Sequence, residues 1–220
     1  MQQFKASAGL MFTAINEDEC ALSGIGTCAD RDIVIPVEYM GRSVVSIADM
    51  AFAQNHEIVS VYVPSSIKTI GEYAFAWCHS LTSVTFENNG VRTLGERCFI
   101  GCDSLTHLYL GDKLHTINEK AFAFCASLQT LSLPHGVQKV GNSAFEGCRS
   151  LVSVSLPETL EELPSNMFGA CVSLSSVSLS RFTKSIGYYA FSFCRSLRSI
   201  NVGNAVVDDQ AFLGCEALAN

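Results

Sequence analysis

The sequence predicts an α/β solenoid, a rod in which short parallel strands and short helical turns repeat along one axis. The first observation is that a Phe-x-x-Cys motif recurs at steps of 24, 23, 23, 23, 23 and 21 residues. The second is the alternating apolar run that follows each motif, as in 128-LQTLSL-133. One such unit cannot bury its apolar side alone, whereas stacked units bury a continuous core.

The repeated unit reads approximately I-G-x-x-A-F-x-x-C-x-S-L-x-x-V-x-L-P. An earlier copy has Phe52 followed by Asn55 in place of the cysteine, so there are about eight copies of roughly 23 residues, and the chain ends within the last. The seven motif pairs are Phe75/Cys78, Phe99/Cys102, Phe122/Cys125, Phe145/Cys148, Phe168/Cys171, Phe191/Cys194 and Phe212/Cys215.

The first half of each unit is predicted to form a short helical turn. In residues 73–78, Ala74 and Phe75 lie four and three positions before Cys78, so all three share one helical face. Gly71 precedes this turn and eases the change of direction. The second half has period-two alternation, which is typical of a strand with one buried face. Proline closes three of these strands, at Pro64, Pro134 and Pro157.

The two ends differ. Residues 11–25 are predicted to form a β-hairpin that caps the first unit, so we divide the chain into a cap (residues 1–36) and a solenoid (residues 37–220). Asn55 in the first unit suits a less buried position near this end. The chain stops at 216-EALAN-220, within the next strand and without a comparable cap. Because an open edge invites strand addition, we expect disorder or an end-to-end homodimer contact near residues 203–220.

Composition excludes several classes of partner. The net charge of −7 argues against nucleic acid, which requires clustered Lys and Arg. No apolar run reaches the ~18 residues of a membrane span, so we expect no membrane insertion. The N-terminal MQQFKASAGLMF has no signal-peptide pattern, which indicates a cytoplasmic protein if Met1 is the native start.

Seven of the ten cysteines fall on one repeat position and form a predicted ladder. Parallel side chains on neighbouring units do not converge as a disulfide requires, and a straight row offers zinc no tetrahedral set. We therefore predict buried free thiols that pack as small apolar side chains. Cys20 and Cys28 lie outside the ladder, and a bridge between them in an oxidising compartment stays open. The rival hypothesis is a thiol-based redox or metal-handling protein, which would need exposed thiols.

No motif for catalysis or cofactor binding is present. The five histidines form neither H-E-x-x-H nor a zinc-type spacing, and there is no G-x-S-x-G elbow or phosphate-binding glycine loop. The acidic clusters lack the pattern of a calcium loop. The sequence therefore predicts no enzyme, no cofactor and no metal.

Binding is predicted on the outward side of the strands. Alternation that buries Val84 and Phe86 exposes the residues between them. Small hydroxyls in the C-terminal units also suit crowded parallel strands without any partner. Aromatic side chains are enriched at binding hot spots, so a protein or glycan partner is expected on the N-terminal part. The candidate residues are Tyr62, Ser83, Thr85, His107, Tyr109, Thr130 and Ser132.

The motif I-G-x-x-A-F-x-x-C-x-S-L, recurring over residues 33–218, resembles the BspA-like leucine-rich repeats of bacteria and protists. The segment 33-IVIPVEYMGRSVVSIADMAF-52 is similar to the entry segment of that family. The resemblance implies a leucine-rich-repeat fold and a non-enzymatic role in adhesion or protein binding at the surface of a bacterial cell. A structural spacer in a longer surface protein is the alternative within this class.

Overall fold

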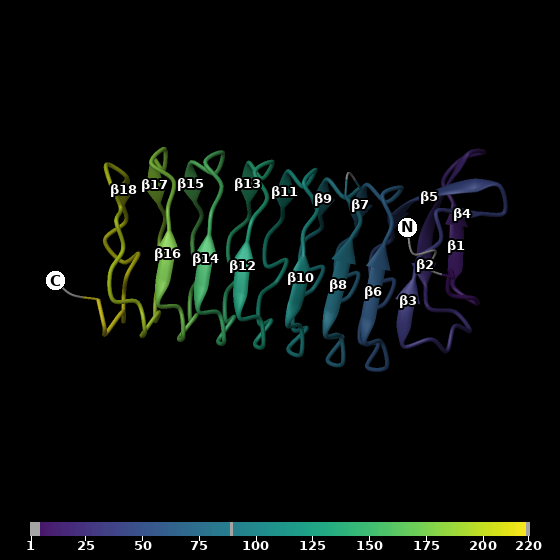
Figure 1. Ribbon diagram of the computed structural model, residues 1–220, viewed down its shortest axis with the longest axis horizontal. Helices are drawn as coiled ribbons and strands as arrows, with labels where there is room; N and C mark the ends of the chain where they lie inside the picture. Colours follow the sequence, from purple (N-terminus) through teal and green to yellow (C-terminus); the bar gives the residue numbers. More distant parts are fainter. Residues whose placement is uncertain (1–4, 89, 219–220) are drawn as a thin grey trace.

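The repeats stack in register and build one rod, with the N-terminal hairpin toward one end and the last repeat toward the other (Figure 1). The structure is a computed structural model that describes residues 5–88 and 90–218. Each turn of the rod is called a rung and is numbered by its repeated phenylalanine, from rung 1 (Phe52) to rung 8 (Phe212). The predicted solenoid is confirmed.

One side of the rod carries the longer strands of the rungs. Pairing is parallel and in register, so that Val61 lies beside Val84 and Val84 beside Leu108. This side is interrupted once, between β10 and β12. The strands are β3 (Asp32–Val34), β6 (Ser60–Val63), β8 (Ser83–Phe86), β10 (His107–Tyr109), β12 (Thr130–Ser132), β14 (Ser153–Ser155) and β16 (Ser176–Ser178). Their outward side chains form the strand face.

A second line of strands runs along another side, and within the repeats from residue 69 onward each of them is two residues long. It comprises β1 (Met11–Ala14), β2 (Glu19–Gly24), β4 (Glu38–Tyr39), β5 (Arg42–Ile47), β7 (Thr69–Ile70), β9 (Thr93–Leu94), β11 (Thr116–Ile117) and β13 (Lys139–Val140), then β15 (Glu162–Leu163), β17 (Ser185–Ile186) and β18 (Val206–Val207). The sheet breaks between β13 and β15. In other rungs the residue after the strand donates its N–H to the preceding rung, as Gly141 does to Ile117 O at 2.8 Å. Pro164 holds that position in rung 6 and has no N–H, which accounts for the break.

The predicted helical turns are hydrogen-bonded turns instead, because no helix occurs in the described residues. Alternate N–H groups point along the rod and bond to the next rung, as Phe75 N does to Cys98 O at 2.7 Å. In a helix those N–H groups would instead donate to carbonyl oxygens of the same segment. The alternation requires left-handed residues, such as Tyr73 (φ 53°) and Trp77 (φ 60°). Within the same described residues no segment has the length and apolarity of a membrane-spanning helix. The outer surface of these turns is called the turn face.

The core is a continuous apolar column with the repeated phenylalanines at its centre. Ring centroids of neighbouring rungs are 4.9 to 5.6 Å apart and the planes are 1° to 18° from parallel. The phenylalanines of rungs 1 to 7 are buried, and Phe212 in rung 8 is half-buried. The register predicted from the spacing of the repeat therefore produces one core rather than a series of small ones.

The N-terminal β-hairpin is confirmed as the antiparallel pair of β1 and β2. Beyond the hairpin, β2 pairs in parallel with β5 and β3 pairs in parallel with β6. The N-terminal residues thus contribute a strand to each side of the rod, and the division at residue 36 stays a prediction.

At the other end, β18 is the terminal strand of its sheet, and Val206 within it is 76% exposed. The disorder or dimer contact predicted for residues 203–220 reaches past the described chain, since residues 219 and 220 lie outside it. The end-to-end homodimer stays a prediction. Light scattering of the protein and of a Val206→Lys variant, which would charge the exposed edge, tests it.

Candidate functional site

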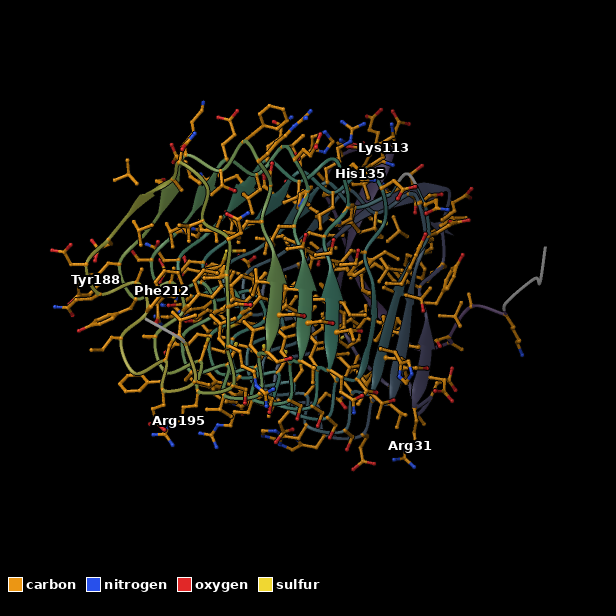
Figure 2. All side chains as sticks on the ribbon, turned by 60° about the vertical axis from the view of Figure 1, so that its left-hand side comes forward. Arg31, Lys113, His135, Tyr188, Arg195 and Phe212 are labelled. Atoms are coloured by element: carbon orange, nitrogen blue, oxygen red, sulfur yellow. The ribbon has the colours of Figure 1, made fainter. Side chains whose placement is uncertain are left out.

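The N-terminal part of the strand face holds two adjoining hollows that share Thr85. The first has a volume of ≈ 220 Å³ and extends over β3, β6 and β8. The second measures ≈ 250 Å³ and extends over β8, β10 and the first residue of β12. Basic side chains stand at the edges of the rod, with Arg31 at one edge and Lys113 and His135 at the opposite one (Figure 2).

In the first hollow, Asp32 and Tyr62 supply the functional groups. The Ser60 hydroxyl donates a hydrogen bond to Asp32 Oδ1, which fixes that carboxylate beside β6. The Tyr62 hydroxyl donates to the Glu87 carboxylate. Burial, followed by the charge of Glu87, raises the pKa of Tyr62. The backbone N–H of Ser65, at 2.7 Å from Glu87 Oε2, lowers the pKa of that carboxyl.

In the second hollow, His107 and Tyr109 project from β10 and are both exposed. His107 Nδ1 and Thr106 Oγ1 are 2.8 Å apart and share a hydrogen bond. The Tyr109 hydroxyl donates to Asn88 Oδ1 at 3.2 Å, so the ring leans toward the loop after β8. This leaves an exposed aromatic surface with its polar end held in place.

Six of the seven candidates predicted from the sequence line these two hollows; Ser132 is exposed on β12 but borders neither. Asp32, Thr106 and Asn88 were not predicted from the sequence. Asp32 was detectable, because 32-DIV-34 alternates as 60-SVY-62 does and precedes it by one rung. The contact of Asn88 depends on how the loop after β8 folds, which no local pattern specifies. Whether the candidates bind a partner stays a prediction.

The repeated cysteines lie inside the rod, and their thiols do more than fill space. Each thiol donates to the backbone oxygen of the phenylalanine in the preceding rung, at 3.0 to 3.4 Å. Burial raises the pKa of the Cys78 and Cys148 thiols to about 12. The sequence predicted small apolar side chains at these positions, and the hydrogen bond was not predicted. The row comprises Cys78, Cys102, Cys125, Cys148, Cys171, Cys194 and Cys215, the last of them half-buried.

These thiols have the opposite properties from reactive ones. A nucleophilic thiol is accessible and has a lowered pKa, whereas burial raises the pKa of Cys102, Cys125 and Cys171 well above its usual value. Cys20 and Cys28 are free thiols in the structure. In the part of the chain that the structure describes, no three His, Cys, Asp or Glu side chains converge as metal ligands.

Comparison with known proteins supports the repeat assignment. A family model described as the BspA type leucine rich repeat region matches in six copies, over residues 45–151 and 92–219. The crystal structure of the T. pallidum leucine rich repeat protein (TpLRR) is 26% identical, with a TM-score of 0.79, over 89% of this chain and 91% of that one. A leucine-rich repeat protein from Bacteroides ovatus is 22% identical, with a TM-score of 0.68, over 99% and 70% of the two chains, and shows the fold. No curated protein sequence matches.

Proposed function

Because the chain belongs to the BspA-type leucine-rich repeat family, we propose that it is a non-enzymatic scaffold that binds a protein partner through the N-terminal part of the strand face. Leucine-rich repeat proteins generally act as protein-interaction scaffolds. The observation that carries the proposal is the pair of hollows that meet at Thr85, bordered by Tyr62 on one side and by Tyr109 on the other.

The chemistry of this surface suits a protein partner. Tyr109 is 53% exposed, and a tyrosine whose hydroxyl is already held presents a large rigid surface that loses little conformational entropy on binding. Asp32, Ser60 and Thr85 supply polar groups around the aromatic rings. The C-terminal strands offer mainly serine at the corresponding positions, for example Ser153 and Ser176, which gives a partner little apolar area to bury.

Three other roles are considered: adhesion is a narrower form of this proposal, and glycan binding and a structural spacer compete with it. Adhesion would require that the partner be displayed by another cell or by extracellular matrix. A glycan could stack on the same tyrosine rings through their apolar faces. A structural spacer would use neither hollow. Two binding assays on the same variants distinguish a protein partner, a glycan partner and a spacer.

We would select peptides from a displayed random library on the wild-type protein and measure their affinities by calorimetry. The test variants are Tyr62→Ser and Tyr109→Ser, and the matched control is Ser176→Ala on the C-terminal strands. We expect each tyrosine substitution to weaken the selected peptides by about 10-fold or more, which is the size of a hot-spot effect. The control variant should bind as the wild type does.

The same variants are tested on a glycan array. Peptides that bind all variants equally would contradict the proposal, because the site would then lie elsewhere. Glycan binding that depends on Tyr62 and Tyr109, without peptide binding, would replace the protein partner with a sugar. If neither peptides nor glycans bind, the proposal fails and the spacer is favoured.

A further inference from the structure

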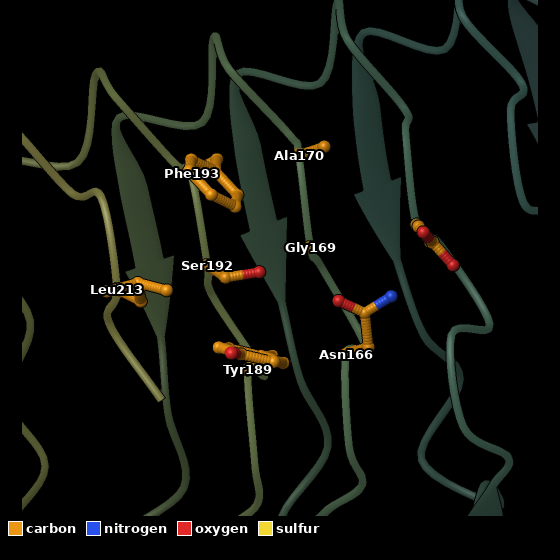
Figure 3. A pocket seen from close by; sticks show the side chains of 8 residues that line it. Asn166, Gly169, Ala170, Tyr189, Ser192, Phe193 and Leu213 are labelled. Carbon is orange, nitrogen blue, oxygen red and sulfur yellow. The ribbon is translucent and has the colours of Figure 1, made fainter. Parts of the chain in front are cut away.

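We propose that the C-terminal half of the turn face carries a second binding site, which accepts a lysine or arginine side chain of a basic protein partner. The site is a pocket of ≈ 290 Å³ over rungs 5 to 8. In Figure 3 the turn segments that line it stand in front of the strands, so the pocket does not belong to the strand face. Its existence is independent of the function proposed above.

The pocket exists because one rung lacks an aromatic cover. In rungs 2, 4 and 7 the residue before the cysteine is aromatic, and its ring lies over a glycine of the next rung: Trp77 over Gly101, Phe124 over Gly147 and Phe193 over Gly214. Rung 6 has Ala170 at this position. The same position of rung 5 holds Gly147, which supplies no ring to cover Ala170. The space over Ala170 therefore stays open.

The pocket presents hydrogen-bond acceptors. Asn166 Nδ2 donates to Ser143 Oγ at 3.1 Å, which orients the amide. The other end of the amide, Oδ1, lies directly over Gly169, where even a Cβ would be only 2.0 Å from it. Glu146 borders the same space and makes no ion pair within the described residues. Two oxygen acceptors, one of them charged, thus face a space that no basic side chain lines.

Two aromatic rings flank the pocket. Tyr189 and Phe193 both come from rung 7, four residues apart, and stand on either side of Ser192 (Figure 3). Phe193 is 46% exposed and Tyr189 packs on Tyr188 with ring centroids 3.9 Å apart. Aromatic faces attract cations, and a carboxylate nearby completes the set of groups that recognises ammonium or guanidinium.

The N-terminal half of the turn face shows the same groups with a cation in place. The Arg97 guanidinium lies over the Tyr73 ring, 5.5 Å from its centroid, and Arg97 also pairs with Glu119 at 3.8 Å. Tyr73 and Tyr189 hold the same position in their rungs, two residues before the phenylalanine. In the rung after Tyr189 the position of Arg97 is taken by Gln210, which has no charge.

The source of the cation follows from size and charge. A volume of ≈ 290 Å³ is at the lower end for small-molecule pockets and suits one side chain. The protein has a net charge of −7, which favours association with a basic protein. The inferred ligand is therefore a single Lys or Arg side chain that projects from such a partner.

The test uses short capped peptides and the full chain. Acetyl-Gly-Arg-Gly-amide and acetyl-Gly-Lys-Gly-amide are titrated into ¹⁵N-labelled protein, with citrulline and norleucine peptides as neutral counterparts. We expect shifts confined to the amides around residues 146, 166, 170, 189 and 193, with dissociation constants on the order of millimolar. The neutral peptides should bind at least about 5-fold more weakly, because they lack the cation.

The variants are Glu146→Gln and Phe193→Ala, with Glu162→Gln as the matched control, since it removes one exposed charge on β15 outside the pocket. We expect the first two to weaken binding about 3- to 10-fold and the control to leave it unchanged. Equal binding of charged and neutral peptides, or wild-type affinity in Glu146→Gln, would overturn the proposal. So would the absence of shifts, or shifts produced by N-acetylglucosamine alone, which would indicate a sugar site.

Discussion

The N-terminal and C-terminal halves of the turn face share one backbone but differ in whether side chains close it. In rungs 2 to 4 the residue after the phenylalanine is apolar, and Ala76, Ile100 and Ala123 form a small buried cluster with Tyr73 packed against it. In rungs 5 to 7 the same position holds Glu146, Gly169 and Ser192, and a pocket is present.

The difference shows that the rod and its surface are specified separately. The phenylalanine column and the cross-rung hydrogen bonds run through both halves without change. A surface position can therefore change from a closing side chain to a pocket residue without loss of the fold. This independence is expected of a solenoid, in which each rung contacts only its neighbours.

The largest predicted effect is the loss of stability at alkaline pH, which should be greater for the buried thiol of rung 2 than for the half-buried thiol of rung 8. Burial raises the pKa of Cys78 to about 12 in the folded protein, above the usual value of 9.0. The thiol therefore stabilises the fold fully below pH 9 and loses this contribution as pH rises toward 12, at about 1.4 kcal/mol per pH unit. Cys215 is half-buried and its pKa is also raised, so it should contribute less.

The measurement is the free energy of urea unfolding between pH 8 and pH 11. Cys78→Ala should reduce the slope of this free energy against pH by the equivalent of close to one proton. Cys215→Ala should reduce the slope by a smaller amount. Stability that is constant across this range would show that the buried thiols do not titrate with unfolding.

A smaller effect is expected at the residue after the phenylalanine. Ile100 in rung 3 is 6% exposed, whereas Leu213 at the same position of rung 8 is 45% exposed. Ile100→Ala should cost about 2–4 kcal/mol in the free energy of unfolding, because it leaves a cavity. Leu213→Ala should cost less than about 1 kcal/mol. Equal losses in chemical denaturation would mean that the two halves are closed to the same degree.

The aromatic covers predict a further contrast. A Cβ at Gly101 would lie 2.0 Å from Trp77 Cε3, and Gly101 also has a φ of 68°. Gly101→Ala should destabilise by about 2 kcal/mol, from left-handed strain and the clash together. Ala170 already occupies the open position with a φ of 58°, so Ala170→Gly should stabilise by about 0.5–1 kcal/mol.

Trp77→Ala is the control for the Gly101 prediction. In that background Gly101→Ala should cost only the strain of its backbone, about 1 kcal/mol. Thermal unfolding of the four proteins gives the coupling between the two positions. Additive effects would show that the ring does not press on residue 101.

The smallest effect is expected at the break in the sheet between β13 and β15. Pro164→Ala supplies the N–H that Gly141 has in the preceding rung, and Val140 O would accept it. The change in stability should stay within about 1 kcal/mol, because the new hydrogen bond is offset by the greater freedom of the unfolded chain. Hydrogen exchange should show the amide of residue 164 protected as that of Gly141 is. Rapid exchange at residue 164 would mean that something other than the proline breaks the sheet.

Much of this architecture was accessible from the sequence. The interval between Phe75 and Phe99 and its successors fixed the rung and the register, and the alternation at Val84 and Phe86 placed Ser83 and Thr85 outward. The helical turns were the error, because the spacing of Ala74, Phe75 and Cys78 suits a helix as well as a turn with alternating left-handed residues. The hydrogen bonds between rungs decide between the two, and their acceptors lie outside the single unit, as Cys98 O does for Phe75 N.

By itself the sequence determined that one apolar column runs through the chain, since a fixed repeat with buried Phe and Cys positions has only one way to bury them all. Tertiary structure alone decided which surface positions meet. Glu146, Asn166 and Phe193 are separated by 20 and 27 residues along the chain and lie around one pocket only because successive rungs stack. Contacts of that kind depend on the orientation of side chains across rungs, and the local pattern of one unit carries no information about them.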